Sequence, residues 1–91
     1  MKFERVKQQN FYVHIRPYWT LLKSYNTIVG IIHNGELFQT KWSRTTSKQI
    51  SQYANSLEIP TKYRNTISSD ELHDIIKKIT GLNIDTRYNC A

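Results

Sequence analysis

The sequence predicts an α+β domain in which a small antiparallel sheet of three or four strands packs with two helices. Apolar and polar residues alternate over residues 11–16, which is typical of a half-buried strand. An Asn-Gly pair stands between two β-rich runs and predicts a hairpin over residues 27–42. Two amphipathic segments with capping residues follow, at about residues 46–58 and 69–80, and predict the helices.

The first strand is predicted over residues 11–16, where three apolar side chains share one face and three more polar ones share the other. Pro17 ends this run, because proline has no backbone N–H for a continuing strand ladder. Residues 18–24 are expected to form either a second short strand or an ordered loop.

The predicted hairpin joins residues 27–32 to residues 36–42 through a two-residue turn at Asn34 and Gly35. Both turn residues tolerate the positive φ that a type I′ turn requires. The register of such a turn predicts one shared face, which a helix could cover, formed by Val29, Ile31, Phe38 and Trp42. The opposite face is expected to be half exposed and carries Ile28, Ile32 and Leu37.

The first helix is predicted at about residues 46–58, with a capping box in which Thr46 caps the helix and Gln49 reaches back. An apolar stripe at helical spacing follows the cap, and Pro60 stops the helix.

The second helix is predicted at about residues 69–80. Ser68 and Glu71 form its capping box, and Gly81 suits the position just after the helix. Residues 82–88 are expected to add an edge strand or to pack as a tail.

The chain has 91 residues, which fits a single domain over residues 1–91 and excludes a multidomain enzyme. No apolar run approaches the ~18 residues of a membrane-spanning helix, and the first ten residues lack a hydrophobic signal core. The single cysteine, Cys90, cannot form an internal disulfide. We therefore expect a soluble protein of a reducing compartment, the cytoplasm, with no membrane partner.

The charge is basic and unevenly distributed. Thirteen Lys and Arg against seven Asp and Glu give a net charge of +6, which also excludes an acidic mimic of DNA. Residues 1–66 hold ten basic and three acidic residues, an excess of +7, whereas residues 67–91 hold three and four, an excess of −1. Such a basic portion indicates an anionic partner, although a moderate net charge can also serve only solubility.

The residues that carry chemistry do not form a recognisable catalytic or metal-binding pattern. His14, His33 and His73 have no ligand spacing with each other or with Cys90. The acidic residues at the start of the second helix suit its dipole. No glycine-rich phosphate loop or nucleophile elbow is present. The sequence therefore predicts no enzyme, no metal site and no cofactor.

The segment from Lys41 to Lys48 leads into a helix N-terminus, where unpaired N–H groups and the helix dipole attract anions. Arg44 and Lys48 would supply charge there, and Thr45 a hydrogen bond; alternatively, the hydroxyls only cap the helix. Aromatic residues near basic ones would suit stacking on unpaired bases, with core packing as the alternative. The candidate binding residues for an anion or an acidic partner are Lys41, Arg44, Thr45, Lys48, Tyr12, Arg16, Lys62 and Arg64.

Part of the chain resembles a family of small uncharacterised proteins from bacteriophages and related mobile elements. The resemblance covers roughly residues 20–57 and rests on the run from Ser24 to Val29, the Asn-Gly hairpin, and the run from Ser43 to Lys48. The family pattern often continues with histidine where this chain has Gln49, so no role of that histidine carries over. The resemblance implies a phage-like genetic setting, in which small proteins commonly bind host enzymes, defence nucleases or nucleic acid.

Three functions are consistent with these features. The preferred hypothesis is a non-enzymatic protein of phage or mobile-element type that binds stoichiometrically to a host nucleic-acid-handling or defence protein, as an anti-CRISPR-like inhibitor does. The first alternative is a small regulator that binds DNA or RNA directly. The second alternative is a structural or assembly component of a virion, which would form a homo-oligomer.

Overall fold

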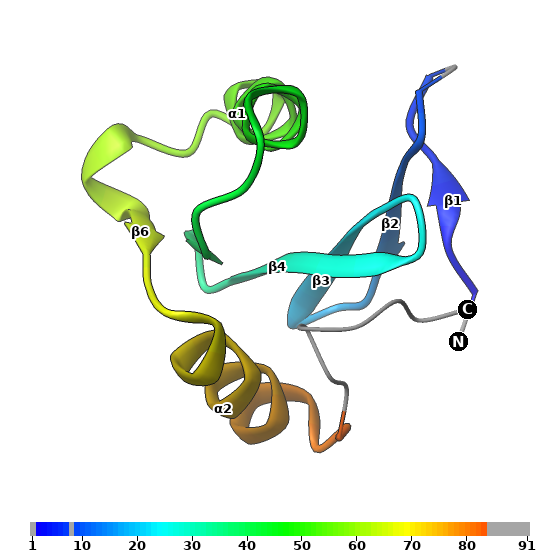
Figure 1. The fold of residues 1–91 in the computed structure, drawn as a ribbon. Helices are drawn as coiled ribbons and strands as arrows, with labels where there is room; N and C mark the ends of the chain where they lie inside the picture. The colour runs from blue at the N-terminus through cyan, green and yellow to red at the C-terminus, as the bar shows by residue number, and fades with distance from the viewer. Residues whose placement is uncertain (1, 8, 84–91) are drawn as a thin grey trace.

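The structure is a computed structural model that describes residues 2–7 and 9–83 (Figure 1). It has the predicted α+β class, with two α-helices and one mixed sheet. The strands are β1 (Glu4–Arg5), β2 (Phe11–Ile15), β3 (Trp19–Ser24), β4 (Thr27–His33), β5 (Glu36–Gln39) and β6 (Arg64–Thr66). The helices are α1 (Arg44–Ser56), the short 3-10 helix η1 (Thr61–Tyr63) and α2 (Ser69–Thr80).

The sheet is larger than predicted and is not wholly antiparallel. Within the described residues its six strands follow the order β1-β2-β3-β4-β5-β6, and the first five form an antiparallel meander. Helix α1 then crosses over, so that β6 pairs parallel to β5. The two edge strands span only two and three residues, which is too short to show a periodic pattern in the sequence.

Helices cover both faces of the sheet, with α1 on one side and α2 on the other (Figure 1). The α1-side cluster consists of Phe11, Val13, Leu22, Val29, Ile32, Leu37, Ile50, Ala54 and Ile59. The α2-side cluster consists of Leu21, Ile28, Ile31, Leu72 and Ile76. The central strands β3 and β4 are therefore buried from both sides, and the apolar residues of both their faces contribute to the core.

A β-bulge between β3 and β4 decides which residues face which helix. Leu22 pairs with Gly30, but the next pair joins Lys23 to Ile28, so Val29 has no partner in β3. An extra residue in one strand reverses the alternation of its side chains beyond that point. Val29 consequently lies on the α1 side, although the simple alternation predicted otherwise.

The predicted faces of the hairpin are therefore wrong. Val29 and Trp42 pack in the α1-side cluster, whereas Ile31 and Phe38 pack in the α2-side cluster. The face expected to be half exposed is covered as well: the buried residues include Ile28, Ile32 and Leu37. The turn itself is confirmed, because Asn34 and Gly35 have φ values of 51° and 75°.

The bulge also determines where the hairpin ends. Strand β5 stops at Gln39, so the predicted extension of pairing to Trp42 is not formed. The Trp42 side chain instead donates a hydrogen bond of 2.9 Å from its indole Nε1 to the carbonyl oxygen of Val29. This bond gives a partner to a carbonyl at the bulge, where the ladder is disrupted, and it anchors the segment that leads into α1.

Helix α1 begins earlier than predicted, at Arg44, and the predicted capping box is wrong. Its N-cap is Ser43, whose side chain accepts from the backbone N–H of Thr46 at 3.4 Å. Thr46 and Gln49 face the buried Ser24 of β3 instead, with oxygen–oxygen distances of 3.3 Å and 3.5 Å. These contacts join the first turns of α1 to the sheet. The helix ends at residue 56.

Helix α2 agrees with its prediction. Ser68 and Glu71 form the capping box, and Gly81 adopts a left-handed conformation with φ of 74° directly after the helix. Leu82 packs on the α2-side cluster. Residues 84–88 of the predicted edge strand or tail lie outside the described residues.

Substituting Gly30 with alanine tests how closely the central strands approach. A Cβ at Gly30 would lie 2.9 Å from the carbonyl oxygen of Phe38, so the backbone of β4 or β5 must shift. We expect Gly30→Ala to lower the free energy of unfolding by about 1–3 kcal/mol, measured by urea denaturation. Ser51→Ala, at an exposed position on α1, should change it by less than about 0.5 kcal/mol. Equal stability of the two variants would contradict the close approach.

A candidate anion-binding groove beside α1

The hydroxyl groups around the start of α1 are mostly used within the fold. Ser43 caps the helix, and Ser47 donates a hydrogen bond of 3.3 Å from its Oγ to the carbonyl oxygen of Trp42. The side-chain hydroxyl of Thr46 contacts Ser24 of β3, as described above. Thr45 is exposed and faces an open hollow. The capping role that the sequence offered as an alternative therefore applies to Ser43, while Thr45 is placed where it can meet a ligand.

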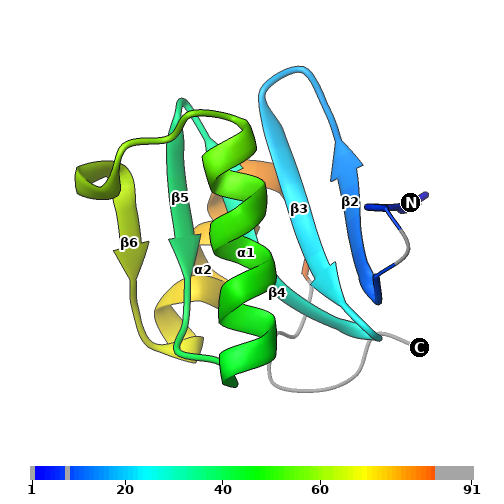
Figure 2. The ribbon, with the colours of Figure 1, turned by 90° about the horizontal axis from the view of Figure 1, so that it is seen from above.

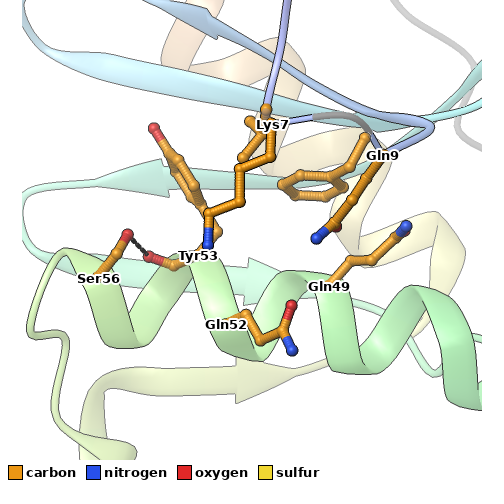
Figure 3. A pocket seen from close by; sticks show the side chains of 8 residues that line it. Lys7, Gln9, Gln49, Gln52, Tyr53 and Ser56 are labelled. Atoms are coloured by element: carbon orange, nitrogen blue, oxygen red, sulfur yellow. Dashed lines mark hydrogen bonds between the residues drawn. The ribbon is translucent and has the colours of Figure 1, made fainter.

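A groove runs between the β1–β2 connection and α1. Its outer part is a hollow of about 410 Å³ that contains Arg44, Thr45 and Lys48. Its inner part is a narrower hollow of about 50 Å³ that contains Lys7 and Tyr53 (Figure 3). Both parts are lined by the same three glutamines, Gln9, Gln49 and Gln52. We call this continuous surface the α1 groove.

Three cationic side chains give the α1 groove a positive potential. Arg44 and Lys48 are exposed and lie one helical turn apart, and the side chain of Lys7 extends from the β1–β2 connection toward α1 (Figure 3). Helix α1 contains no acidic residue along its whole length, so no carboxylate on the helix neutralises them. The positive end of its dipole lies at the same end as Arg44.

The groups of the α1 groove can bind phosphate or carboxylate oxygens. The guanidinium of Arg44 can donate two parallel hydrogen bonds to one anion, and the ammonium of Lys48 can add a third. The amides of Gln9, Gln49 and Gln52 can donate to anion oxygens and accept from N–H groups. The arrangement therefore suits a partner with several negative charges and further polar groups between them.

The inner part of the α1 groove has an aromatic floor. The rings of Phe11 and Tyr53 lie with centroids 5.9 Å apart at an interplanar angle of 58°. Burial raises the pKa of the Tyr53 phenol above its ordinary value of 10.0. The phenol is neutral near pH 7, as an ordinary tyrosine also is, and places no negative charge beside Lys7.

The remaining predicted residues lie away from this groove. Lys41 is exposed in the segment before α1 but does not line the groove. Tyr12 alternates with β2 residues of the α1-side cluster, so it faces the α2 side. Its ring is already contacted by Arg5 and Lys23, at 5.8 Å and 5.0 Å from the centroid. Arg16 follows the last residue of β2 and is exposed.

The last two predicted residues lie beyond the C-terminal end of α1. Arg64 donates from Nε to the carbonyl oxygen of Ile59 at 2.9 Å and from a terminal guanidinium nitrogen to Oδ1 of Asn55 at 2.7 Å. Its guanidinium therefore connects α1 to β6. Lys62 is exposed, with Nζ 5.1 Å from the centroid of the Tyr63 ring. Of the predicted set, only Arg44, Thr45 and Lys48 share the α1 groove.

The predicted binding set did not include Lys7 or the three glutamines of the groove. Gln49 and Gln52 lie one and four positions after Lys48 in the sequence. Residues four positions apart are neighbours on a helix, so the spacing alone indicated that Gln52 lies beside Lys48. Lys7 and Gln9 carried no such signal, because their position depends on the two-residue strand β1.

In the described part of the chain, no group of three or more His, Cys, Asp and Glu residues is arranged to hold a metal ion. Nε2 of His73 lies 3.1 Å from Oδ1 of Asn83, and Nδ1 of His14 lies 2.7 Å from the carbonyl oxygen of Lys2. The same described residues contain no helix long and apolar enough to span a bilayer.

Replacing Arg64 with alanine separates its structural contacts from binding. The variant loses the hydrogen bonds to Asn55 and Ile59, so we expect the free energy of unfolding to fall by about 1–3 kcal/mol in urea denaturation. Lys62→Ala, at the exposed cation two residues earlier, should change it by less than about 0.5 kcal/mol. An Arg64→Ala variant that keeps full stability but no longer binds a partner would contradict this structural role and would show that Arg64 belongs to the binding surface.

The raised pKa of Tyr53 predicts a loss of stability in alkaline solution. The unfolded phenol ionises near its ordinary pKa of 10.0, before the folded one does. The contribution of Tyr53 is therefore fully present below that pH and is lost as the pH rises through the folded pKa. Tyr53→Phe should make the free energy of unfolding fall less steeply between about pH 9 and pH 11. Tyr25→Phe, at an exposed tyrosine, should keep the original slope of the free energy of unfolding against pH. Equal slopes for the two variants would refute the assignment of the alkaline loss of stability to Tyr53.

Comparison of the chain with protein-family models, with curated proteins and with solved structures finds no match.

Proposed function

We propose that this chain is a non-enzymatic binding protein that contacts a host nucleic-acid-handling protein stoichiometrically through the α1 groove. The observation that carries the proposal is the alignment of Lys7, Arg44 and Lys48 along one groove, beside a helix without acidic residues. The contact is either with an acidic patch of that protein or with the phosphates of nucleic acid that it holds.

The physical chemistry of the groove supports a polyanionic partner. Clustered cations with a net charge of +6 on the chain steer an anionic partner toward the protein during encounter. Arg44 and Lys48 then form charge-assisted hydrogen bonds, and the glutamines between the cations satisfy other polar groups of the partner. The α1 groove requires no chemical step for such a function.

The biological setting of the proposal comes from the resemblance of residues 20–57 to phage and mobile-element proteins. In that setting the chain would act in the cytoplasm of the host cell, as an inhibitor of a defence nuclease or a related enzyme. An anti-CRISPR-like protein would inhibit by occupying the surface that its target uses for nucleic acid. The proposed role involves neither a membrane nor a cofactor.

Direct binding of DNA or RNA is the second candidate function. The observation that favours it is the row of Gln9, Gln49 and Gln52 beside the cations, because glutamine amides hydrogen-bond both phosphates and base edges. Such binding would weaken linearly with salt in a log–log plot.

The double variant Arg44→Ala/Lys48→Ala tests the α1 groove as the contact surface. We expect its affinity for the captured partner to fall by roughly a hundredfold, at about 1.5 kcal/mol for each lost charged contact. The measurement is affinity capture from host-cell lysate with mass spectrometry, with and without nuclease, followed by titration of the recovered partner. The control is Lys77→Ala/Lys78→Ala, which removes the same charge at exposed sites on α2, outside the groove.

The outcomes separate the two candidate functions. A protein partner retained after nuclease treatment supports the first function. Recovery of nucleic acid alone supports direct binding, and the salt slope of the groove variant should then be smaller by about 1.4–1.8 for the two lost cations. Equal binding by the groove variant and its control would refute the role of the α1 groove in either function.

A further inference from the structure

The exposed apolar side chains of this protein gather at one end of the sheet. Among residues 2–7 and 9–83, five large hydrophobic side chains are exposed. Four of them belong to the end where the β2–β3 turn, the β4–β5 turn and the last turn of α1 meet (Figure 2). They are Ile15, Tyr18, Leu57 and Tyr63, which are 62%, 79%, 48% and 43% exposed. We call this surface the apolar end.

Strand pairing and one hollow bring the parts of the apolar end to the same end of the sheet. Trp19 pairs with His33, which brings the β2–β3 turn beside the end of β4. A hollow of about 440 Å³ then joins the β4–β5 turn to Leu57 and Tyr63. Exposed apolar side chains that adjoin each other in this way mark an interaction surface, whereas isolated ones are common on any protein.

The charges of the apolar end are nearly balanced, unlike those of the chain. Arg16 lies on the side of the β2–β3 turn, while Glu36 and Glu58 line the hollow on the side of α1. Lys62 adjoins Tyr63, and Arg64 bonds the carbonyl oxygen of Ile59 in the hollow, so three cations against two carboxylates leave this end close to neutral. The chain as a whole carries +6, so two copies repel least when they approach through this end.

We propose that the apolar end is the interface of a homodimer with two-fold symmetry. The cation Arg16 and the acidic hollow lie on opposite sides of the β4–β5 turn. A two-fold axis near this turn therefore places Arg16 of each copy against Glu58 and Glu36 of the other. The apolar side chains between these charges are buried by the same contact.

The dimer would leave the cationic outer part of both α1 grooves free. The last turn of α1 belongs to the interface, whereas Arg44 and Lys48 lie in its first two turns, at the opposite end of the helix (Figure 2). The outer parts of the two grooves therefore lie at the far ends of the dimer. If the proposed function holds, a partner with repeated anionic sites is bound twice, which increases the overall affinity. The dimer itself does not depend on that function.

The oligomeric state in the absence of any partner tests the proposal. Sedimentation equilibrium should give twice the chain mass of 10.8 kDa for the purified protein. Tyr18→Ser and Leu57→Ser should each shift the equilibrium toward the monomer, with unchanged circular dichroism spectra. The matched control is Tyr25→Ser, since Tyr25 is 61% exposed in the β3–β4 turn at the opposite end of the sheet. This control should remain dimeric.

A charge exchange identifies the orientation of the two copies. Arg16→Glu and Glu58→Arg should each weaken the dimer by about a hundredfold, because two-fold symmetry makes each contact twice. The double variant Arg16→Glu/Glu58→Arg restores opposite charges and should recover the dimer. A wild-type monomer at about 0.5 mM, equal effects of Tyr18→Ser and Tyr25→Ser, or no recovery in the double variant would each overturn the proposed interface. None of these results would bear on binding by the α1 groove.

Discussion

The hydrogen bond from the indole of Trp42 to the carbonyl oxygen of Val29 is the contact on which the arrangement of sheet and helices depends. The bulge at Val29 disrupts the ladder between β3 and β4, and a buried carbonyl without a partner would cost roughly 1–3 kcal/mol. The Trp42 side chain supplies that partner from the segment directly before α1. The same bond therefore stabilises an irregular sheet and fixes the point at which α1 starts.

The bulge also explains how a chain with 38% hydrophobic residues fills a core on two sides of a sheet. Regular alternation would place Val29, Ile31 and Phe38 on one face and Ile28, Ile32 and Leu37 on the other. The shift sends Val29 to the α1 side and leaves Ile28 and Ile31 for α2. Each helix then meets a buried set of branched side chains. Both helices pack on strands β3, β4 and β5, so packing on these strands, together with the Trp42 bond, determines the position of α1 relative to the sheet.

Local chemistry explains which parts of the fold were predictable from the sequence. The turn at Asn34 and Gly35 and the caps of α2 depend on residues adjacent in the chain, and both predictions are confirmed. The strand β6 and the cap of α1 depend on distant partners. Thr46 is a good capping residue by sequence, but the buried Ser24 of β3 engages its side chain, and Ser43 caps the helix instead. In the site, their closeness to the predicted helix N-terminus placed Arg44 and Lys48 together, whereas nothing local indicated that Arg64 binds Asn55 or that Lys7 faces α1.

Helix α1 separates two surfaces with opposite physical requirements. A polyanion is attracted most strongly where positive charges accumulate, and the N-terminal end of α1 adds its dipole to Arg44 and Lys48. Association between identical basic chains is favoured at the surface where the net charge is smallest and the exposed apolar area is largest. In this protein that surface lies at the C-terminal end of α1, with Leu57 and Glu58. If both features shared one end, a second copy would meet the same cations that attract the anionic partner, and the two interactions would compete. Their separation along one helix gives the proposed self-association and the proposed anion binding different surfaces.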